Sequence, residues 1–118
     1  MRNTAVTAVV APSAAQLLTS CAAPPNFATN KLRHAAIGVG GMGGSDLNQI
    51  AAHKDVEIIA LCDVDANNLQ AAAKLHPEAR LYTDWRELLK AEYRHIDSVN
   101  VTTPDHMHAP ISYKAIEL

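Results

Sequence analysis

The sequence predicts an α/β fold, a doubly wound parallel sheet that is incomplete and limited to its N-terminal half. Three observations support this prediction. Apolar runs of strand length alternate with helical patterns from residue 35 onward, all five glycines fall between Gly38 and Gly44, and Asp63 directly follows the second apolar run. Strands that alternate with helices of this length call for parallel pairing with right-handed crossovers.

The patterning places the elements in order. Strands are expected at residues 35–39, 56–62, 81–83 and 96–102, and helices at residues 45–52 and 67–75, from 85 onward and from near 108 onward. Asp84 is expected to cap the third helix, because Glu87 follows three positions later as in a capping box. The fourth strand should return beside the first and open a crevice. Thr102, Thr103 and Pro104 are expected at its carboxyl end, facing that crevice.

The glycines predict a phosphate-binding turn between the first strand and the first helix. Gly38, Gly40 and Gly43 match the spacing G-x-G-x-x-G, in which the first glycine permits a tight turn, the second lets the backbone approach a pyrophosphate, and the third lets helix and strand pack closely. The helix N-terminus then offers N–H groups to the anion. A phosphate-loop NTPase is excluded, because its motif needs a lysine where this chain has Gly44. A methyltransferase that uses S-adenosylmethionine and a turn without a ligand remain as alternatives.

Asp63 predicts which dinucleotide is bound. It lies twenty residues beyond Gly43, at the expected end of the second strand. A carboxylate there can accept both ribose hydroxyls of adenosine and repels a 2′-phosphate. Residues 64–66 contain no Arg or Lys that could receive such a phosphate. NAD is therefore expected as cofactor and NADP is disfavoured. Cys62 is expected to be a small buried hydrophobe.

Composition and the N-terminal sequence indicate the class of the protein and its expected location. A hydrophobic content of 48% and a net charge of −2 describe an ordinary globular core without the basic surplus that nucleic-acid binding requires. Residues 3–30 carry no charged side chain, and residues 1–21 resemble a short signal peptide that ends in a lipobox at Leu18-Thr19-Ser20-Cys21. Residues 22–31 would be a linker and residues 32–118 the folded domain. The expected location is periplasmic or membrane-anchored through lipid on Cys21; a leader on a cytoplasmic protein is the alternative.

Four segments together resemble one family. They are residues 38–43, 60–65, 82–89 and 103–108, the last with the pattern T-P-x-x-x-H. The run from residue 37 to residue 118 resembles the N-terminal NAD(P)-binding Rossmann domain of the Gfo/Idh/MocA oxidoreductases. The resemblance implies that the pyrophosphate turn consists of Gly38, Gly40, Gly41, Met42 and Gly43, and that the ribose-binding acid is Asp63. It also implies that the strand end on the nicotinamide side is Thr102, Thr103 and Pro104, and that His108 is a histidine near the cofactor.

The resemblance also implies an activity, namely hydride transfer between NAD(P) and a sugar, inositol or related polyol. In this family the Glu-Lys-Pro motif and the Asp/His pair that carry the chemistry lie further along than Leu118, so no catalytic residue is assigned here. No metal site is assigned either, because His106 and His108 have no third ligand near them in the sequence. The full-length protein is expected to be a homo-oligomer. A stand-alone nucleotide-binding module and an NAD-dependent glycosidase of the same family are the alternatives.

Overall fold

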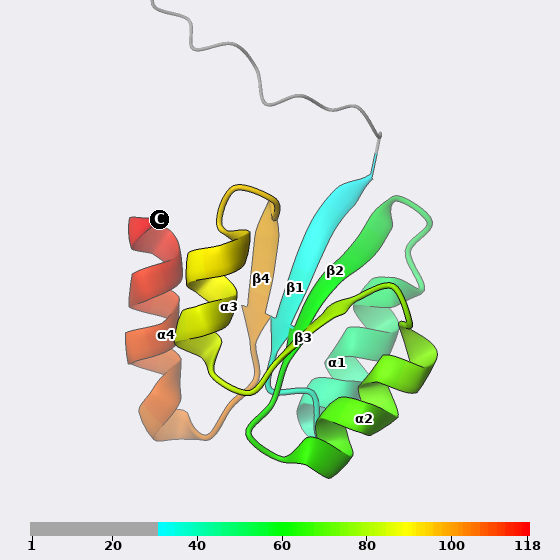
Figure 1. Cartoon of the computed structure of the whole chain (residues 1–118), viewed down its shortest axis with the longest axis horizontal. Helices are drawn as coiled ribbons and strands as arrows, with labels where there is room; N and C mark the ends of the chain where they lie inside the picture. Colours follow the sequence, from blue (N-terminus) through cyan, green and yellow to red (C-terminus); the bar gives the residue numbers. More distant parts are fainter. Residues whose placement is uncertain (1–30) are drawn as a thin grey trace, which may run out of the picture.

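The structure is a computed structural model that describes residues 31–118, where strands and helices alternate along the chain (Figure 1). The predicted leader, with its predicted lipidation site at Cys21, and residues 22–30 of the predicted linker lie outside the described residues. The elements are β1 (Leu32–Ile37), α1 (Met42–Ala51), β2 (Val56–Cys62), α2 (Ala66–Leu75), β3 (Arg80–Tyr82), α3 (Trp85–Glu92), β4 (Ser98–Val101) and α4 (Asp105–Glu117).

The four strands form one parallel sheet in the order β3-β2-β1-β4. The first strand, β1, lies inside the sheet. The next two strands, β2 and β3, extend the sheet on one side of β1, and β4 then pairs with β1 on its other side. The strand order therefore reverses between β1 and β4. In open α/β sheets ligands bind outside the carboxyl ends of the strands at such a reversal. The predicted fold class, an α/β doubly wound parallel sheet, is confirmed.

Two helical layers cover opposite faces of the sheet (Figure 1). Because successive residues of a strand point to opposite faces, β1 contributes to two separate cores. Ala36 packs with α1 and α2, and Ala35 and Ile37 pack with α3 and α4. The buried members of the first core are Ala36, Val39, Leu47, Leu61, Leu69, Ala72 and Ala79, and those of the second are Ala35, Ile37, Ala60, Cys62, Leu88, Leu89 and Ile111.

Helix α1 begins at Met42, three residues before the expected start, so that two glycines lie in its first turn. Gly41 is the N-cap residue and has φ 53°, a conformation that glycine adopts without strain. A Cβ atom on Gly43 would overlap the carbonyl oxygen of Gly38. The glycines therefore allow the helix to start immediately after the strand, although glycine is a poor helix former elsewhere.

Helix α4 also begins earlier than expected, at Asp105 instead of near His108, and β4 is shorter than residues 96–102. Pro104 precedes α4 with φ −55°, and Asp105 places a carboxylate in the first turn, where the helix dipole favours negative charge. A helix needs about 20 residues to cross a bilayer. The longest helix within residues 31–118 is α4, with 13 residues, and none there could span a membrane.

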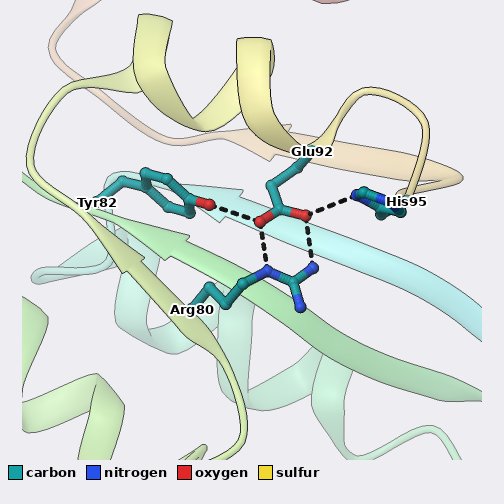
Figure 2. Close-up of polar contacts among 4 residues, drawn as sticks. All are labelled: Arg80, Tyr82, Glu92 and His95. Carbon is teal, nitrogen blue, oxygen red and sulfur yellow. Dashed lines mark hydrogen bonds and ion pairs between the residues drawn. The ribbon is translucent and has the colours of Figure 1, made fainter.

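The short strand β3 is fixed to α3 by the carboxylate of Glu92 (Figure 2). Arg80 donates two hydrogen bonds to this carboxylate, the Tyr82 hydroxyl donates a third at 2.6 Å, and His95 lies 3.5 Å away. Glu92 is only 2% exposed. The Arg80 guanidinium is the main reason that the pKa of Glu92 is lowered, although burial opposes the shift. This cluster of Arg80, Tyr82, Glu92 and His95 is hereafter the Glu92 cluster.

Candidate functional site

The glycine-rich turn brings the end of β1 close to both β4 and α1. Gly38 has φ +84°, and a Cβ atom on it would overlap the Thr102 carbonyl oxygen at the end of β4. A Cβ atom on Gly43 would overlap the Gly38 carbonyl and would lie 3.3 Å from Cβ of Thr102. The first glycine thus permits the tight turn, and the third permits the close approach of helix and strand, as the motif predicts.

The N-terminus of α1 differs from those of the next two helices. Asp65 caps α2 by accepting the Asn67 N–H at 2.8 Å, and Asp84 caps α3 by accepting the Arg86 N–H at 2.8 Å. No side chain caps α1, and its first turn carries no acidic residue. The partial positive charge of this N-terminus is therefore left for another anion.

Asp63 lies against the glycine-rich turn. One carboxylate oxygen accepts the N–H groups of Val39 and Gly40 at 2.8 and 3.2 Å, and the other accepts the Asp65 N–H at 2.9 Å. The carboxylate therefore holds the backbone of the turn and of the loop after β2. The oxygen that accepts from Asp65 keeps acceptor capacity beyond this bond. Contact with a ribose remains a prediction.

At the end of β4, the two threonines have different surroundings. The Thr102 hydroxyl donates to Asp46 at 3.2 Å, whereas the Thr103 hydroxyl is buried and makes no hydrogen bond within residues 31–118. His108 reaches back with Nε2 to the Thr103 carbonyl oxygen at 2.6 Å. The predicted histidine therefore orders the strand end, and the free hydroxyl belongs to Thr103.

These elements enclose a cleft of about 620 Å³ at the carboxyl end of the sheet. Six of the predicted site residues line it, namely Gly38, Gly40, Asp63, Thr102, Thr103 and Pro104. The other four, Gly41, Met42, Gly43 and His108, are not among its lining residues. Gly43 is buried behind the turn, and Met42 is 72% exposed on its outer side. The structure thus gathers the two strand ends and the turn, with these four residues around that centre.

Sequence reasoning missed the part of the cleft formed by the first turns of three helices. Asn68 of α2, Trp85 and Arg86 of α3 and His106 of α4 line it. Asn68 lies against the turn, since a Cβ atom on Gly40 would overlap its side-chain amide. The sequence contains a signal that could have predicted these residues. Each helix begins where a parallel strand ends, so the residues of its first turn lie at the carboxyl edge of the sheet, where the cleft is.

The charged groups of the cleft are mostly acidic. Asp63, Asp65 and Asp84 line it, and Arg86 is the side chain there that carries a permanent positive charge. The Arg86 guanidinium lies 4.6 Å from the Trp85 ring centroid and 3.4 Å from Asp84, and its side chain is 67% exposed. It is therefore held only loosely at the mouth of the cleft.

Within residues 31–118, neither the Cys62 thiol nor a cluster of metal ligands adds a reactive group to the cleft. Cys62 lines the cleft, and burial, with a smaller contribution from nearby carboxylates, raises the pKa of its thiol to about 12. The thiol is therefore protonated at neutral pH and unreactive, as expected for a small buried hydrophobe. Within residues 31–118, no three His, Cys, Asp or Glu side chains are grouped so that they could hold a metal ion.

The donor and acceptor set of the cleft fits a dinucleotide. The uncapped N-terminus of α1 suits a pyrophosphate, and the Asp63 carboxylate suits vicinal hydroxyls. The buried Thr103 hydroxyl leaves a polar atom without a partner where the strand reversal opens the sheet. Such an atom costs stability unless something binds it.

Comparison with known proteins gives a family match over the whole described domain. A family model described as an oxidoreductase family with an NAD-binding Rossmann fold matches residues 32–118. Among curated relatives, a glycosyl hydrolase family 109 protein of Stenotrophomonas maltophilia is 33% identical over 98 residues, which cover 74% of this chain and 21% of that protein.

Solved structures agree with the family match. Myo-inositol 2-dehydrogenase of Lactobacillus plantarum superposes with a TM-score of 0.68 at 25% identity, over 74% of this chain and 25% of that chain. The WlbA dehydrogenase of Bordetella pertussis, in complex with NADH and UDP-GlcNAcA, superposes with a TM-score of 0.62 at 27% identity, over 75% of this chain and 24% of that chain. This chain therefore spans about a quarter or less of each of these proteins.

Proposed function

This chain belongs to the Gfo/Idh/MocA oxidoreductase family, with an NAD-binding Rossmann fold at residues 32–118, and we propose that it binds NAD in preference to NADP. The observation that carries the proposal is the position of Asp63. Its carboxylate lies beside the turn and lines the cleft, and the two residues that follow it there, Val64 and Asp65, carry no positive charge. A 2′-phosphate would meet this carboxylate, whereas a 2′-hydroxyl would donate to it.

The remaining contacts follow from the shape of the cleft. The pyrophosphate would lie at the N-terminus of α1, over Gly41, where the space that a Cβ atom would occupy is empty, and beside the Asn68 side chain that lies against Gly40. The nicotinamide would lie toward the reversal between β1 and β4, where the Thr103 hydroxyl can bond a carboxamide. When bound, the nicotinamide would supply hydride transfer. The residues of this chain would orient it and keep one ring face toward a substrate.

We infer that the whole protein transfers hydride between this cofactor and a sugar, inositol or related polyol, and that it does so as a homo-oligomer. Two relatives with structures support this proposal, since their names include a myo-inositol dehydrogenase and a dehydrogenase complexed with a UDP-sugar. The glycosyl hydrolase relative supports a second candidate, a glycosidase that uses the same cofactor.

An activity and binding experiment separates these possibilities. The protein from the complete gene would be titrated calorimetrically with NAD and NADP, and then assayed with polyols and sugars for NADH formation and with aryl glycosides for hydrolysis. Tighter NAD binding with NADH formation is the expected result. Hydrolysis without net NADH favours the glycosidase, and binding without either reaction favours a nucleotide-binding module. Tighter NADP binding would contradict the cofactor proposal.

We further propose that the leader directs export and that Cys21 becomes a lipidated N-terminus, which would place the protein in the periplasm or on a membrane. The support is the uncharged stretch of residues 3–30 with its lipobox. In its own host the protein should fractionate with membranes, and Cys21→Ser should release it or block its maturation. Mass spectrometry that finds an intact Met1 on soluble protein would show that the leader is retained.

A further inference from the structure

A chain of four side-chain hydrogen bonds runs from the amino end of β4 to α1. His34 Nδ1 lies 2.7 Å from the Ser98 hydroxyl, and His34 Nε2 lies 3.1 Å from Asn100 Oδ1. The Asn100 amide then donates to the Thr102 hydroxyl at 3.0 Å, which donates to Asp46 at 3.2 Å. The nucleotide-binding proposal uses only Thr102 among these five residues, hereafter the polar chain.

The polar chain follows one face of the sheet. Ser98, Asn100 and Thr102 are two residues apart, so their side chains lie on the same face of β4 and its continuation. His34 pairs with Ser98 in the β1–β4 register and is 5% exposed. Asp46 reaches the chain from α1, which covers this face. Three elements of the sheet and its helical layer are thereby joined by one network.

The carboxylate of Asp46 fixes the direction of every bond in the chain. An ionised carboxylate only accepts, so the single Thr102 proton must go to Asp46. Thr102 can then only accept from Asn100, which must turn its NH₂ group toward Thr102 and its oxygen toward His34. His34 must therefore carry its proton on Nε2. Burial lowers the pKa of His34, so the imidazole is neutral at neutral pH and Nδ1 accepts from Ser98.

Thr102 is the point at which this network meets the nucleotide turn. Its carbonyl oxygen occupies the space that a Cβ atom on Gly38 would need, and its own Cβ lies close to Gly43. The residue is thus enclosed by the first and third glycines of the motif. The packing therefore leaves little space for Thr102 to move relative to the turn.

We propose that His34, Asn100 and Asp46 are positioning residues that act through Thr102 to hold the glycine-rich turn in the geometry that binds a dinucleotide. This inference rests on the proposed cofactor. None of the three side chains lines the cleft, so their effect on binding must pass through Thr102. Polar chains of this kind act as units, because each bond polarises the next.

The first test is spectroscopic and does not need the cofactor. In protein from the complete gene labelled with ¹⁵N-histidine, the ring nitrogen shifts of His34 report its tautomer. The wild type should show the Nε2–H form alone. Asp46→Asn removes the fixed acceptor, so a population of the Nδ1–H form should appear at His34, three hydrogen bonds away. A wild type in the Nδ1–H form, or a variant with an unchanged tautomer, would overturn the directed chain.

The second test measures binding. Asn100→Leu keeps the side-chain size but breaks the chain in its middle, and it should weaken NAD binding about fivefold while the far-UV circular dichroism stays unchanged. Asn48→Leu makes the same substitution at an exposed position of α1 and should leave binding unchanged. If Asn100→Leu fails to fold, Asp46→Asn should show a similar weakening.

The outcomes separate this inference from the proposed function. A wild type that binds NAD together with an Asn100→Leu or Asp46→Asn variant that binds it equally well overturns the positioning role alone. A wild type that binds neither NAD nor NADP overturns the proposed function, and the positioning role with it. Weaker binding in both chain variants, with Asn48→Leu unchanged, supports both.

Discussion

Two carboxylates of this domain, Asp63 and Glu92, accept several hydrogen bonds each but have opposite surroundings. Asp63 accepts from three backbone N–H groups and lies in the cleft. Glu92 accepts from the side chains of Arg80 and Tyr82, and is 2% exposed (Figure 2). The backbone partners leave Asp63 uncompensated by a cation and open to a ligand. The side-chain partners of Glu92 neutralise it and leave no space.

The difference indicates how a functional carboxylate can be recognised in such a fold. A carboxylate that organises a turn and still faces a cleft keeps both charge and acceptor capacity for a ligand. A carboxylate enclosed by an arginine, a tyrosine and a histidine serves to join two elements, here β3 and α3. Substitutions at the two places should therefore affect different properties, binding at Asp63 and stability at Glu92.

The largest effect is expected at Arg80. Arg80→Met leaves the buried Glu92 without its main counter-ion, and should lower the free energy of unfolding by about 2 kcal/mol, less than the roughly 3–5 kcal/mol of a fully buried pair because Arg80 is half exposed. Chemical denaturation would measure the loss. Arg33→Met breaks the pair with Asp97, a carboxylate that is 20% exposed where Glu92 is 2% exposed, and serves as the control, with a smaller loss. Equal losses would mean that burial of Glu92 is unimportant.

The next effect concerns binding at Asp63. Asp63→Ser should reduce NAD affinity about tenfold and narrow the preference for NAD over NADP, because both the ribose acceptor and the repulsive charge are removed. Asp63→Asn keeps one acceptor oxygen for the turn N–H groups, so it should narrow the preference with less loss of stability. Calorimetric titration of both variants with both nucleotides is the measurement. A preference that survives in both variants would assign the selectivity to other residues.

A smaller effect is the response to acid. Arg80 lowers the pKa of Glu92 in the folded protein, so the ion pair stabilises the fold above the carboxyl pKa of the unfolded chain, about 4.3, and this contribution is lost as the pH falls through the lower folded value. Thermal melts should therefore show a decline below about pH 4.3. Glu92→Gln should flatten the decline, leaving the part due to Asp97, whose pKa Arg33 lowers in the same direction. An identical acid profile in the variant would contradict this assignment.

The smallest effect is expected at Arg86, the permanently charged side chain at the mouth of the cleft. Arg86→Gln should weaken NADP binding about twofold to threefold with little change for NAD, because an exposed guanidinium offers a phosphate only a screened attraction. The ratio of the two dissociation constants at low and at moderate salt would measure it. If NAD affinity falls more than NADP affinity, Arg86 contacts a part that both nucleotides share.

The sequence predicted the elements of this domain well where the pattern is local. β2 occupies residues 56–62 as expected, and Asp84 caps α3 as expected. The starts of α1 and α4 were misplaced, because Gly43, Gly44 and Pro104 resemble loop residues until their packing is known. Helix propensity alone therefore misjudged two first turns that tertiary contacts stabilise.

Contacts between distant residues were not predictable in the same way. Asp63 and the N–H groups of Val39 and Gly40 are more than twenty residues apart, and the closure of one on the other depends on the β1–β2 register. His34 lies 64 residues from Ser98, and Arg80 gains its role only from the packing of α3. These partners follow from topology, so a one-dimensional pattern could indicate the site but not the network behind it.

The most direct test of the central claim is a crystal structure of the protein from the complete gene with NAD bound. We predict that the adenosine ribose donates a hydrogen bond to Asp63 and that the pyrophosphate lies at the N-terminus of α1. The Thr103 hydroxyl should gain a partner at the nicotinamide end. An adenosine bound elsewhere, with Asp63 still held only by the turn N–H groups, would contradict the account.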